Sequence, residues 1–144
     1  MRTVSTLALF LFAMHASAQQ DLSKYKWRNR VLLFSASSLK EENFVAQYKN
    51  FLDYPKKLDD RNLILFTLVK GRIYDKDLNV VSNYDVAALR KKYGLPGNFN
   101  GLALIGKDGA TKLKKEFPVE PRTVFESIDQ MPMRQKEMRE NIDD

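Results

Sequence analysis

The chain lacks cysteine altogether, and its 144 residues include a single histidine, His15. Without cysteine it can form no disulfide and offers no thiolate for nucleophilic or redox chemistry. A long apolar run is also missing, because the longest one spans residues 3–14 and falls short of the ~20 residues that a transmembrane helix needs. The sequence therefore predicts neither a thiol enzyme nor a membrane-spanning protein.

The first 18 residues have the order of a secretory signal peptide. Met1-Arg2 provides a positive start, residues 3–14 form a short apolar core, and Ala16-Ser17-Ala18 is a small-x-small cleavage site. We expect cleavage after Ala18, which leaves a secreted or periplasmic protein of residues 19–144.

His15 lies inside this segment, so the exported part has neither cysteine nor histidine. Ser-His-Asp and Cys-His catalysis are thereby excluded, as are ordinary zinc, haem and iron–sulfur sites. Asp75-x-Asp77-x-Asn79 imitates the start of a calcium loop, but Val80 and Val86 stand where that loop needs glycine and glutamate. We predict no catalytic residue, no metal ligand and no cofactor.

Residues 19–144 are expected to form one domain. Apolar residues make up 44% of the chain and charged residues 29%, which are ordinary values for a globular protein. Lysine and arginine number 24 against 18 acidic residues. This excess suits an anionic surface or an acidic protein partner, or it simply keeps the domain soluble. Nucleic acid is not an expected partner of an exported protein.

The apolar pattern predicts three buried strands and one edge strand. Residues 30–35, 63–69 and 101–106 are continuous apolar runs, which are typical of strands covered on both faces. Asp108-Gly109 predicts a hairpin turn, after which residues 111–117 return as a lysine-rich strand suited to a sheet edge. Residues 70–83 are polar and turn-rich, and leave room for a further short hairpin.

Helices are predicted between these strands by caps and apolar spacing. Ser37 or Ser38 can cap a first helix, whose apolar stripe is expected from Phe44, Val45, Tyr48, Phe51 and Leu52 and which ends at Pro55. Ser82-x-x-Asp85 opens a second helix that Gly94 closes, Pro121 starts a third, and Pro132 interrupts or restarts it. The predicted order is β-α-β-α-β-β-α, an α/β, thioredoxin-like layer with a mixed sheet of about four strands.

Four blocks of the sequence resemble the domain-of-unknown-function 4174 family. They are Lys26-Trp27-Arg28-Asn29-Arg30-Val31-Leu32-Leu33, Asp60-Arg61-Asn62-Leu63, Ile105-Gly106-Lys107-Asp108-Gly109-x-x-Lys112 and Ile128-Asp129-x-Met131-Pro132-Met133-Arg134. The resemblance covers about residues 25–139. It implies a module similar to thioredoxins and peroxiredoxins, and to the repeated domains of coiled-coil domain-containing protein 80 and the sushi-repeat-containing proteins. No established activity comes with it.

The resemblance places Ser35, Ser37 and Ser38 where a redox protein of this fold has cysteine. We interpret them as residues that cap the following helix, and the alternative is a cleft that attracts anions to the start of that helix. The cis-proline of thioredoxins has no clear equivalent, because Pro96 lies five residues before Gly101.

The basic residues of the resembling blocks are the other candidates. They are either structural anchors, with Asp60 or Asp129 as their acidic partners, or a site for a ligand or partner. The candidate residues are Arg28, Arg30, Arg61, Lys107, Asp108, Gly109, Lys112 and Arg134. For Arg134 we expect an anchoring role, in which its guanidinium ties the last helix to Asp60 or another buried acceptor.

The function predicted from the sequence is that of an exported, cysteine-free binding or interaction module. One alternative is an enzyme related to oxidoreductases that has a cysteine-independent activity. Another is a protein that binds polyanions through its basic clusters, Arg90-Lys91-Lys92 and Lys112-x-Lys114-Lys115. The sequence does not identify a partner.

Overall fold

The computed structural model of the chain describes residues 19–143, so the expected signal peptide lies outside the described residues. Six strands form one sheet in the order β4-β3-β2-β1-β5-β6. The strands are β1 (Arg30–Ala36), β2 (Leu63–Val69), β3 (Arg72–Tyr74), β4 (Val80–Val81), β5 (Gly101–Ile105) and β6 (Thr111–Glu116). The central strand β1 runs parallel to β2 and antiparallel to β5.

The sheet has two more strands than the four that the sequence predicts. The additional hairpin, β3 and β4, continues the sheet beyond β2, with Leu68 opposite Ile73 and Ile73 opposite Val81. These strands are three and two residues long, too short for an alternating pattern to distinguish them from a turn-rich loop. The hairpin covers the edge of β2 and leaves only short strands there.

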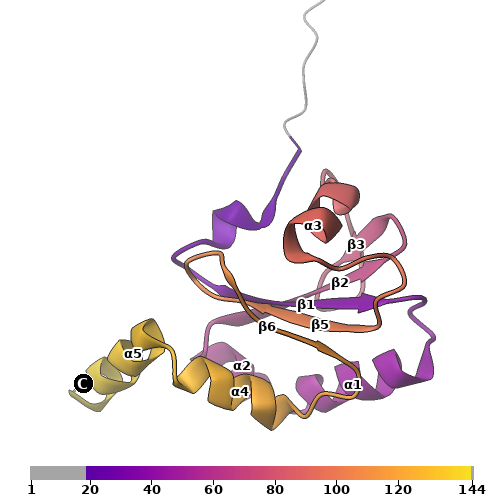
Figure 1. The fold of residues 1–144 in the computed structure, drawn as a ribbon. Coiled ribbons are helices and arrows are strands. Elements are labelled where there is room, and N and C mark those ends of the chain that lie inside the picture. The colour runs from indigo at the N-terminus through magenta and orange to yellow at the C-terminus, as the bar shows by residue number, and fades with distance from the viewer. Residues whose placement is uncertain (1–18, 144) are drawn as a thin grey trace, which may run out of the picture.

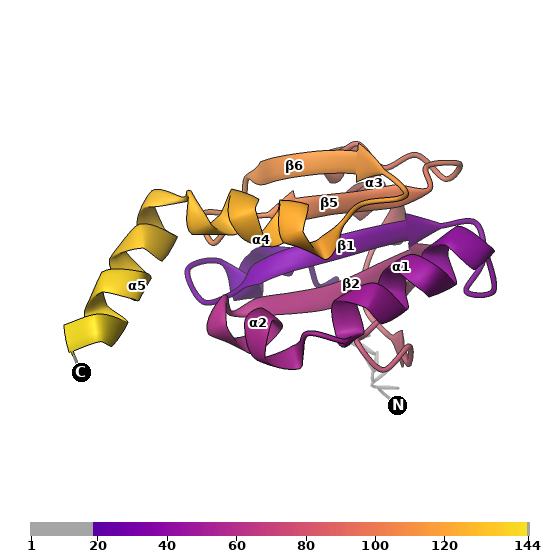
Figure 2. The same ribbon diagram turned by 90° about the horizontal axis from the view of Figure 1, so that it is seen from below.

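The helices cover the two faces of the sheet. The elements are η1 (Leu22–Tyr25), a short 3₁₀ helix, and α1 (Glu42–Leu52), α2 (Pro55–Asp60), α3 (Val86–Tyr93), α4 (Pro121–Asp129) and α5 (Pro132–Asp143). Figure 1 shows α1, α2 and α4 below the sheet and α3 with η1 above it. Figure 2 views the lower layer directly, and there α5 extends beyond the end of the sheet. Among residues 19–143 no helix is long and apolar enough to span a membrane.

The side chains of β1 point alternately into two cores. Leu32 and Phe34 belong to the core under α1 and α4, whereas Val31 and Leu33 belong to the core under α3 and η1. All four are at most 2% exposed. A strand covered on both faces is stabilised by apolar residues at every position, because each side chain is removed from water. This explains the continuous apolar run.

The helix boundaries correct several details of the prediction. Glu41 caps α1, because its carboxylate accepts the backbone N–H groups of Asn43 and Phe44, so neither Ser37 nor Ser38 is the cap. Asp85, rather than Ser82, is the N-cap of α3, whereas Gly94 ends this helix with φ 63°, as predicted. Pro55 does not end α1, which stops at Leu52, but begins α2, a helix that the sequence did not predict. Pro121 and Pro132 begin helices, as predicted. Val45 and Leu52 of the expected stripe are exposed, and Gln47 is buried in their stead.

Candidate functional site

The candidate residues lie at the two opposite ends of β1. Ser35 and the exposed Ser37 and Ser38 lie at its carboxyl end. Arg30 begins the strand, opposite Leu63 of the parallel β2. Because β5 is antiparallel, its last residue pairs near the same place, with Ile105 opposite Val31. The topology therefore collects the resembling blocks at the amino end of β1, away from the serines.

At the carboxyl end, Ser35 is fully buried and its hydroxyl accepts a hydrogen bond from Arg90 Nη1 at 3.0 Å. Burial lowers the pKa of the Arg90 guanidinium, which is a donor and has no lone pair to accept a proton from Ser35. Arg90 also donates to the carbonyl groups of Lys70 and Leu95. It therefore links the Ser35 side chain to two segments of backbone and does not activate the serine.

A hollow of about 580 Å³ lies beside this end, lined in part by Ser37, Ser38 and Lys40. The first free amides of α1 face the carboxylate of Glu41, at 3.1 Å from Asn43 N and 2.7 Å from Phe44 N. The chain's own anion thus occupies the place that an anionic ligand would take at a helix N-terminus. The serines provide neither the cap nor a vacant anion site.

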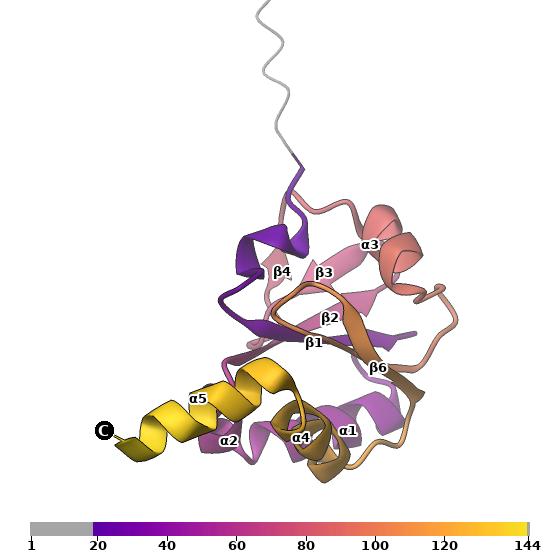
Figure 3. The same cartoon turned by 60° about the vertical axis from the view of Figure 1, so that its left-hand side comes forward.

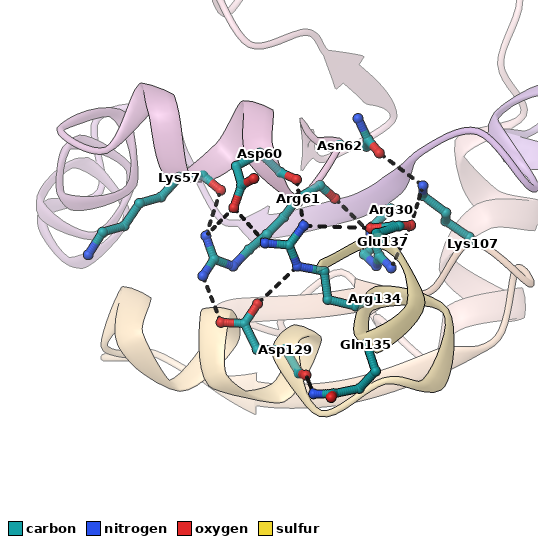
Figure 4. A network of polar contacts seen from close by, with 10 residues as sticks. All are labelled: Arg30, Lys57, Asp60, Arg61, Asn62, Lys107, Asp129, Arg134, Gln135 and Glu137. Carbon is teal, nitrogen blue, oxygen red and sulfur yellow. Dashed lines mark hydrogen bonds and ion pairs between the residues drawn. The ribbon is translucent and has the colours of Figure 1, made fainter. Parts of the chain in front are cut away.

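At the amino end, Arg134 and Arg61 share the carboxylate of Asp129 (Figure 4). Arg134 donates through Nε to Asp129 Oδ1 at 3.2 Å, and Arg61 through Nη2 to Asp129 Oδ2 at 2.7 Å. Arg134 also meets Asp60, with Nη2 at 2.5 Å from its Oδ2 and Nη1 at 2.8 Å from its carbonyl oxygen. The contact between Arg134 and Asp60 that the sequence suggested is present, and it joins α5 to the end of α2.

A second group centres on Glu137 of α5. The buried Arg30 donates Nη1 to Glu137 Oε2 at 3.1 Å, and Lys107 Nζ lies 2.6 Å from Oε1. Lys107 also donates to Asn62 Oδ1 at 2.9 Å. Figure 4 shows that these residues come from β1, α5 and the turns before β2 and β6. Glu137 was not predicted from the sequence. The residues around it are mostly polar, as in a solvent-exposed helix, and Arg30 lies 107 residues away along the chain.

Two carboxyl groups of the network have lowered pKa values. Burial alone would raise the pKa of Glu137, but hydrogen bonds from Lys107 and Arg30 outweigh burial and hold it below the ordinary value. Burial is likewise outweighed at Asp129, where Arg61 and Arg134 lower the pKa. Both groups therefore remain ionised at neutral pH. Each of the four cations Arg30, Arg61, Arg134 and Lys107 is paired with Asp60, Asp129 or Glu137, so four positive charges face three negative ones.

Beside this network lies a pocket of about 550 Å³, which we call the Trp27 pocket. Its lining residues are Trp27, Arg30, Gly106, Lys107, Asp108, Lys112, Ser127, Gln130, Met131, Pro132 and Met133. Three of the four resembling blocks supply most of them, one before β1, one at the β5–β6 turn and one at the α4–α5 corner. Trp27 is 61% exposed and Met133 39%. The pocket thus offers apolar surface to solvent beside a network of ion pairs.

The backbone holds Trp27 in place at this pocket. Its φ of 66° lies in the left-handed region, which is uncommon for a residue with a large side chain. The Trp27 N–H donates to Lys107 O at 2.7 Å, which ties the residue to the β5–β6 turn. Arg30 lines the same pocket, and its buried Nε has no hydrogen-bond partner in the described part of the chain. The left-handed backbone of Trp27 and the unpaired Nε of Arg30 are both unfavourable locally, and such features are typical of functional sites.

The remaining candidates lie around the β5–β6 turn. Lys112 Nζ is 2.7 Å from Asp108 Oδ2, and this hydrogen bond lowers the pKa of Asp108. Gly109 has φ 82°, which explains the glycine of the predicted turn. The side chain of Arg28 is exposed and makes no polar contact within residues 19–143. No cluster of potential metal-ligating side chains occurs among the described residues.

Solved structures with a similar fold define its class. The reduced 2-Cys peroxiredoxin of Plasmodium vivax is 14% identical, with a TM-score of 0.58 over 80% of this chain and 84% of that one. Thioredoxin peroxidase I of Plasmodium yoelii is 13% identical, with a TM-score of 0.54 over 80% and 79% of the two chains. The fold is therefore that of the thioredoxin and peroxiredoxin class, as the sequence predicted.

A family model places the chain more closely. The model described as "Domain of unknown function (DUF4174)" matches residues 21–137. The chain belongs to this family, which confirms the resemblance seen in the four blocks. No curated protein sequence matches the chain.

Proposed function

We propose that this domain is an exported binding module that works without redox chemistry, and that the Trp27 pocket is its binding site. The observation that carries the proposal is the convergence of three resembling blocks on one pocket with an exposed tryptophan at its rim. Exposed apolar surface collected in a hollow is typical of a binding site. The carboxyl end of β1, where Ser35, Ser37 and Ser38 lie, offers no activated nucleophile.

The occupant that suits this pocket is an apolar side chain of an exported protein partner. Trp27, Met131 and Met133 supply large, adaptable apolar contacts. Arg30 and Lys107 of the lining are paired with Glu137, and Lys112 is paired with Asp108, so each of these cations already has a carboxylate partner.

A random peptide library displayed on phage tests this proposal with residues 19–144 as bait. Trp27 is the only tryptophan of the chain, so binding of a selected, tryptophan-free peptide is expected to shift its fluorescence. Calorimetry is expected to show loss of binding in Trp27→Ala and weaker binding in Met133→Ala. Val80→Ala is the matched control, because Val80 is 57% exposed on β4 at the far edge of the sheet.

Two outcomes contradict the proposal. The first is a library that yields no binder for a correctly folded domain. The second is a set of binders whose affinity is the same for wild type and Trp27→Ala, because those peptides would occupy another surface.

The redox and export parts of the proposal have separate tests. Pure protein is expected to show no insulin reduction and no peroxide turnover above a buffer control, since no thiolate is available. Mass spectrometry of the protein from its native cells is expected to find a chain that begins at Gln19. A chain that retains residues 3–18 in the cytoplasm would contradict export.

A further inference from the structure

A second hollow lies on the other side of the β5–β6 turn, and we call it the lysine groove. Its volume is about 350 Å³, and its lining residues are Leu22, Ser23, Tyr25, Lys26, Asn29, Val31, Lys92, Tyr93, Ile105, Gly106, Asp108, Gly109 and Ala110. Gly106 and Asp108 also line the Trp27 pocket. The two hollows are therefore adjacent, and one ligand can reach both across the turn.

The lysines of this groove differ from the cations of the charge network. Lys26 and Lys92 form no ion pair within residues 19–143, whereas Arg30 and Lys107 share Glu137. Lys26 Nζ lies 5.4 Å from the ring centroid of Trp27, and Lys92 Nζ lies 5.5 Å from that of Tyr93. Rings in these positions hold the ammonium groups by cation–π attraction. The groove thus presents two positioned positive charges.

The acidic residues nearby form no ion pair with Lys26 or Lys92 in the described part of the chain. Asp108 is paired with Lys112 at 2.7 Å. The carboxylate of Asp21 accepts the N–H of Ser23 at 2.9 Å, and hydrogen bonds with the side chain and backbone of Ser23, more than the charge of Lys92, lower its pKa. Neither acid forms an ion pair with Lys26 or Lys92 within the described residues.

The wider surface has the same excess of positive charge. Residues 22–29 contain three lysine or arginine residues and no acid, and residues 86–115 contain seven against the single Asp108. Of these seven, Lys107 is paired with Glu137 and Lys112 with Asp108. These segments form η1, α3 and the β5–β6 hairpin, and Figures 1 and 3 show η1 and α3 on the same side of the sheet. A field of one sign over a concave surface favours a ligand of the opposite sign.

This inference rests on the proposed function. We propose that the segment of the partner protein that enters the Trp27 pocket carries acidic residues next to its apolar side chain. The apolar side chain enters the Trp27 pocket, and the carboxylates lie in the lysine groove against Lys26 and Lys92. An extended acidic segment suits this arrangement better than a flat anionic membrane, because the charges line a groove that is continuous with an apolar pocket.

The test uses the tightest peptide from the phage selection and a copy with each Asp or Glu replaced by Asn or Gln. Selected peptides are expected to be enriched in acidic residues. Wild type is expected to bind the acidic peptide about tenfold more tightly than its amide copy. This difference is expected to shrink when salt rises from about 0.05 M to about 0.5 M.

Two double variants locate the effect. Lys26→Gln with Lys92→Gln is expected to bind both peptides equally, at the affinity of the amide copy. Lys49→Gln with Lys56→Gln removes the same charge from exposed positions on α1 and α2, and is expected to keep the wild-type preference. Circular dichroism and thermal unfolding verify that both variants are folded.

The possible failures are distinguishable. If wild type binds both peptides equally while Trp27→Ala still abolishes binding, the proposed function stands and the acidic partner is rejected. If neither peptide depends on Trp27, the proposed function itself fails. Binding of polygalacturonate or phosphatidylglycerol vesicles that depends on Lys26 and Lys92 but not on Trp27 also rejects the acidic peptide, in favour of a polysaccharide or a membrane.

Discussion

Arg30 and Glu137 form a two-pronged ion pair between the first strand and the last helix. Arg30 Nη1 lies 3.1 Å from Glu137 Oε2 and Arg30 Nη2 lies 3.3 Å from Oε1. The guanidinium is 1% exposed and the carboxylate 22%. Arg30 thus depends on Glu137 for its compensating charge, and Glu137 also accepts Lys107.

Replacing Glu137 with Gln is expected to destabilise the domain by about 3 kcal/mol, because it leaves the charge of Arg30 buried without a counter-ion. Urea unfolding measures the change. Glu140→Gln is the control, since Glu140 makes only an exposed pair with Lys136 at 3.7 Å and is expected to lose less than about 0.5 kcal/mol. Equal effects of the two changes would show that the Arg30 pair adds no stability.

Acid is expected to weaken the fold through the same carboxylate. The pKa of folded Glu137 lies below the ordinary value of 4.5, so its contribution is present above pH 4.5 and is lost as pH falls through the folded pKa. Asp129 adds a similar loss below its ordinary value of 3.8. Urea midpoints from about pH 7 to about pH 3 are expected to fall less steeply in Glu137→Gln than in wild type. Parallel curves would contradict this linkage.

Arg134→Ala is expected to lower the free energy of unfolding by about 1–3 kcal/mol, because Asp60 loses its hydrogen-bond partner and Asp129 keeps only Arg61. Thermal unfolding measures it. Arg122→Ala is the control, because Arg122 pairs with Glu126 on the exposed face of α4 and is expected to change stability little. An unchanged midpoint for Arg134→Ala would reject the anchoring role and direct the search for a ligand to this residue.

Gly101→Ala is expected to destabilise the β5–β6 hairpin. A Cβ at this position would lie 2.2 Å from the carbonyl oxygen of Lys115 and 2.8 Å from Cα of Glu116. The strands must move apart, at an expected loss of about 2 kcal/mol or more in thermal unfolding. At Gly71 a Cβ meets no atom within 4 Å, so Gly71→Ala is expected to be neutral. A neutral Gly101→Ala would show that β6 yields without loss.

The sequence predicted those parts of the fold in which neighbouring residues determine the structure. Continuous apolar runs located β1, β2 and β5, and Gly94, Gly109 and Pro121 marked boundaries through their own backbone preferences. The strands β3 and β4 were not predicted from the sequence beyond room for a short hairpin. They are stabilised by the pairing of β3 with β2 and of β4 with β3, and they have no apolar pattern of their own.

The candidate site shows the same division. The blocks that line the Trp27 pocket are visible in the sequence, but their convergence depends on the strand order, which places residues from three distant turns together. Glu137 lies 107 residues from Arg30 along the chain, so no local spacing indicates that pair. Ser37 and Ser38 were predicted to cap α1 only because they precede it in the sequence. The side chain of Glu41, nearer to the first turn, provides the cap instead.

The anchoring of α5 defines where the folding unit ends. Arg134 is its only buried side chain among those described, and the last ion pair with another part of the fold belongs to Glu137, whereas Ile142 is 82% exposed. The family model also ends at residue 137. A stop codon after Glu137 would therefore spare the ion pairs through which Arg134 and Glu137 hold α5 to the rest of the fold. A stop codon before Arg134 would remove both Arg134 and Glu137. Met131 and Met133, which line the Trp27 pocket, would then no longer be held in place by these ion pairs.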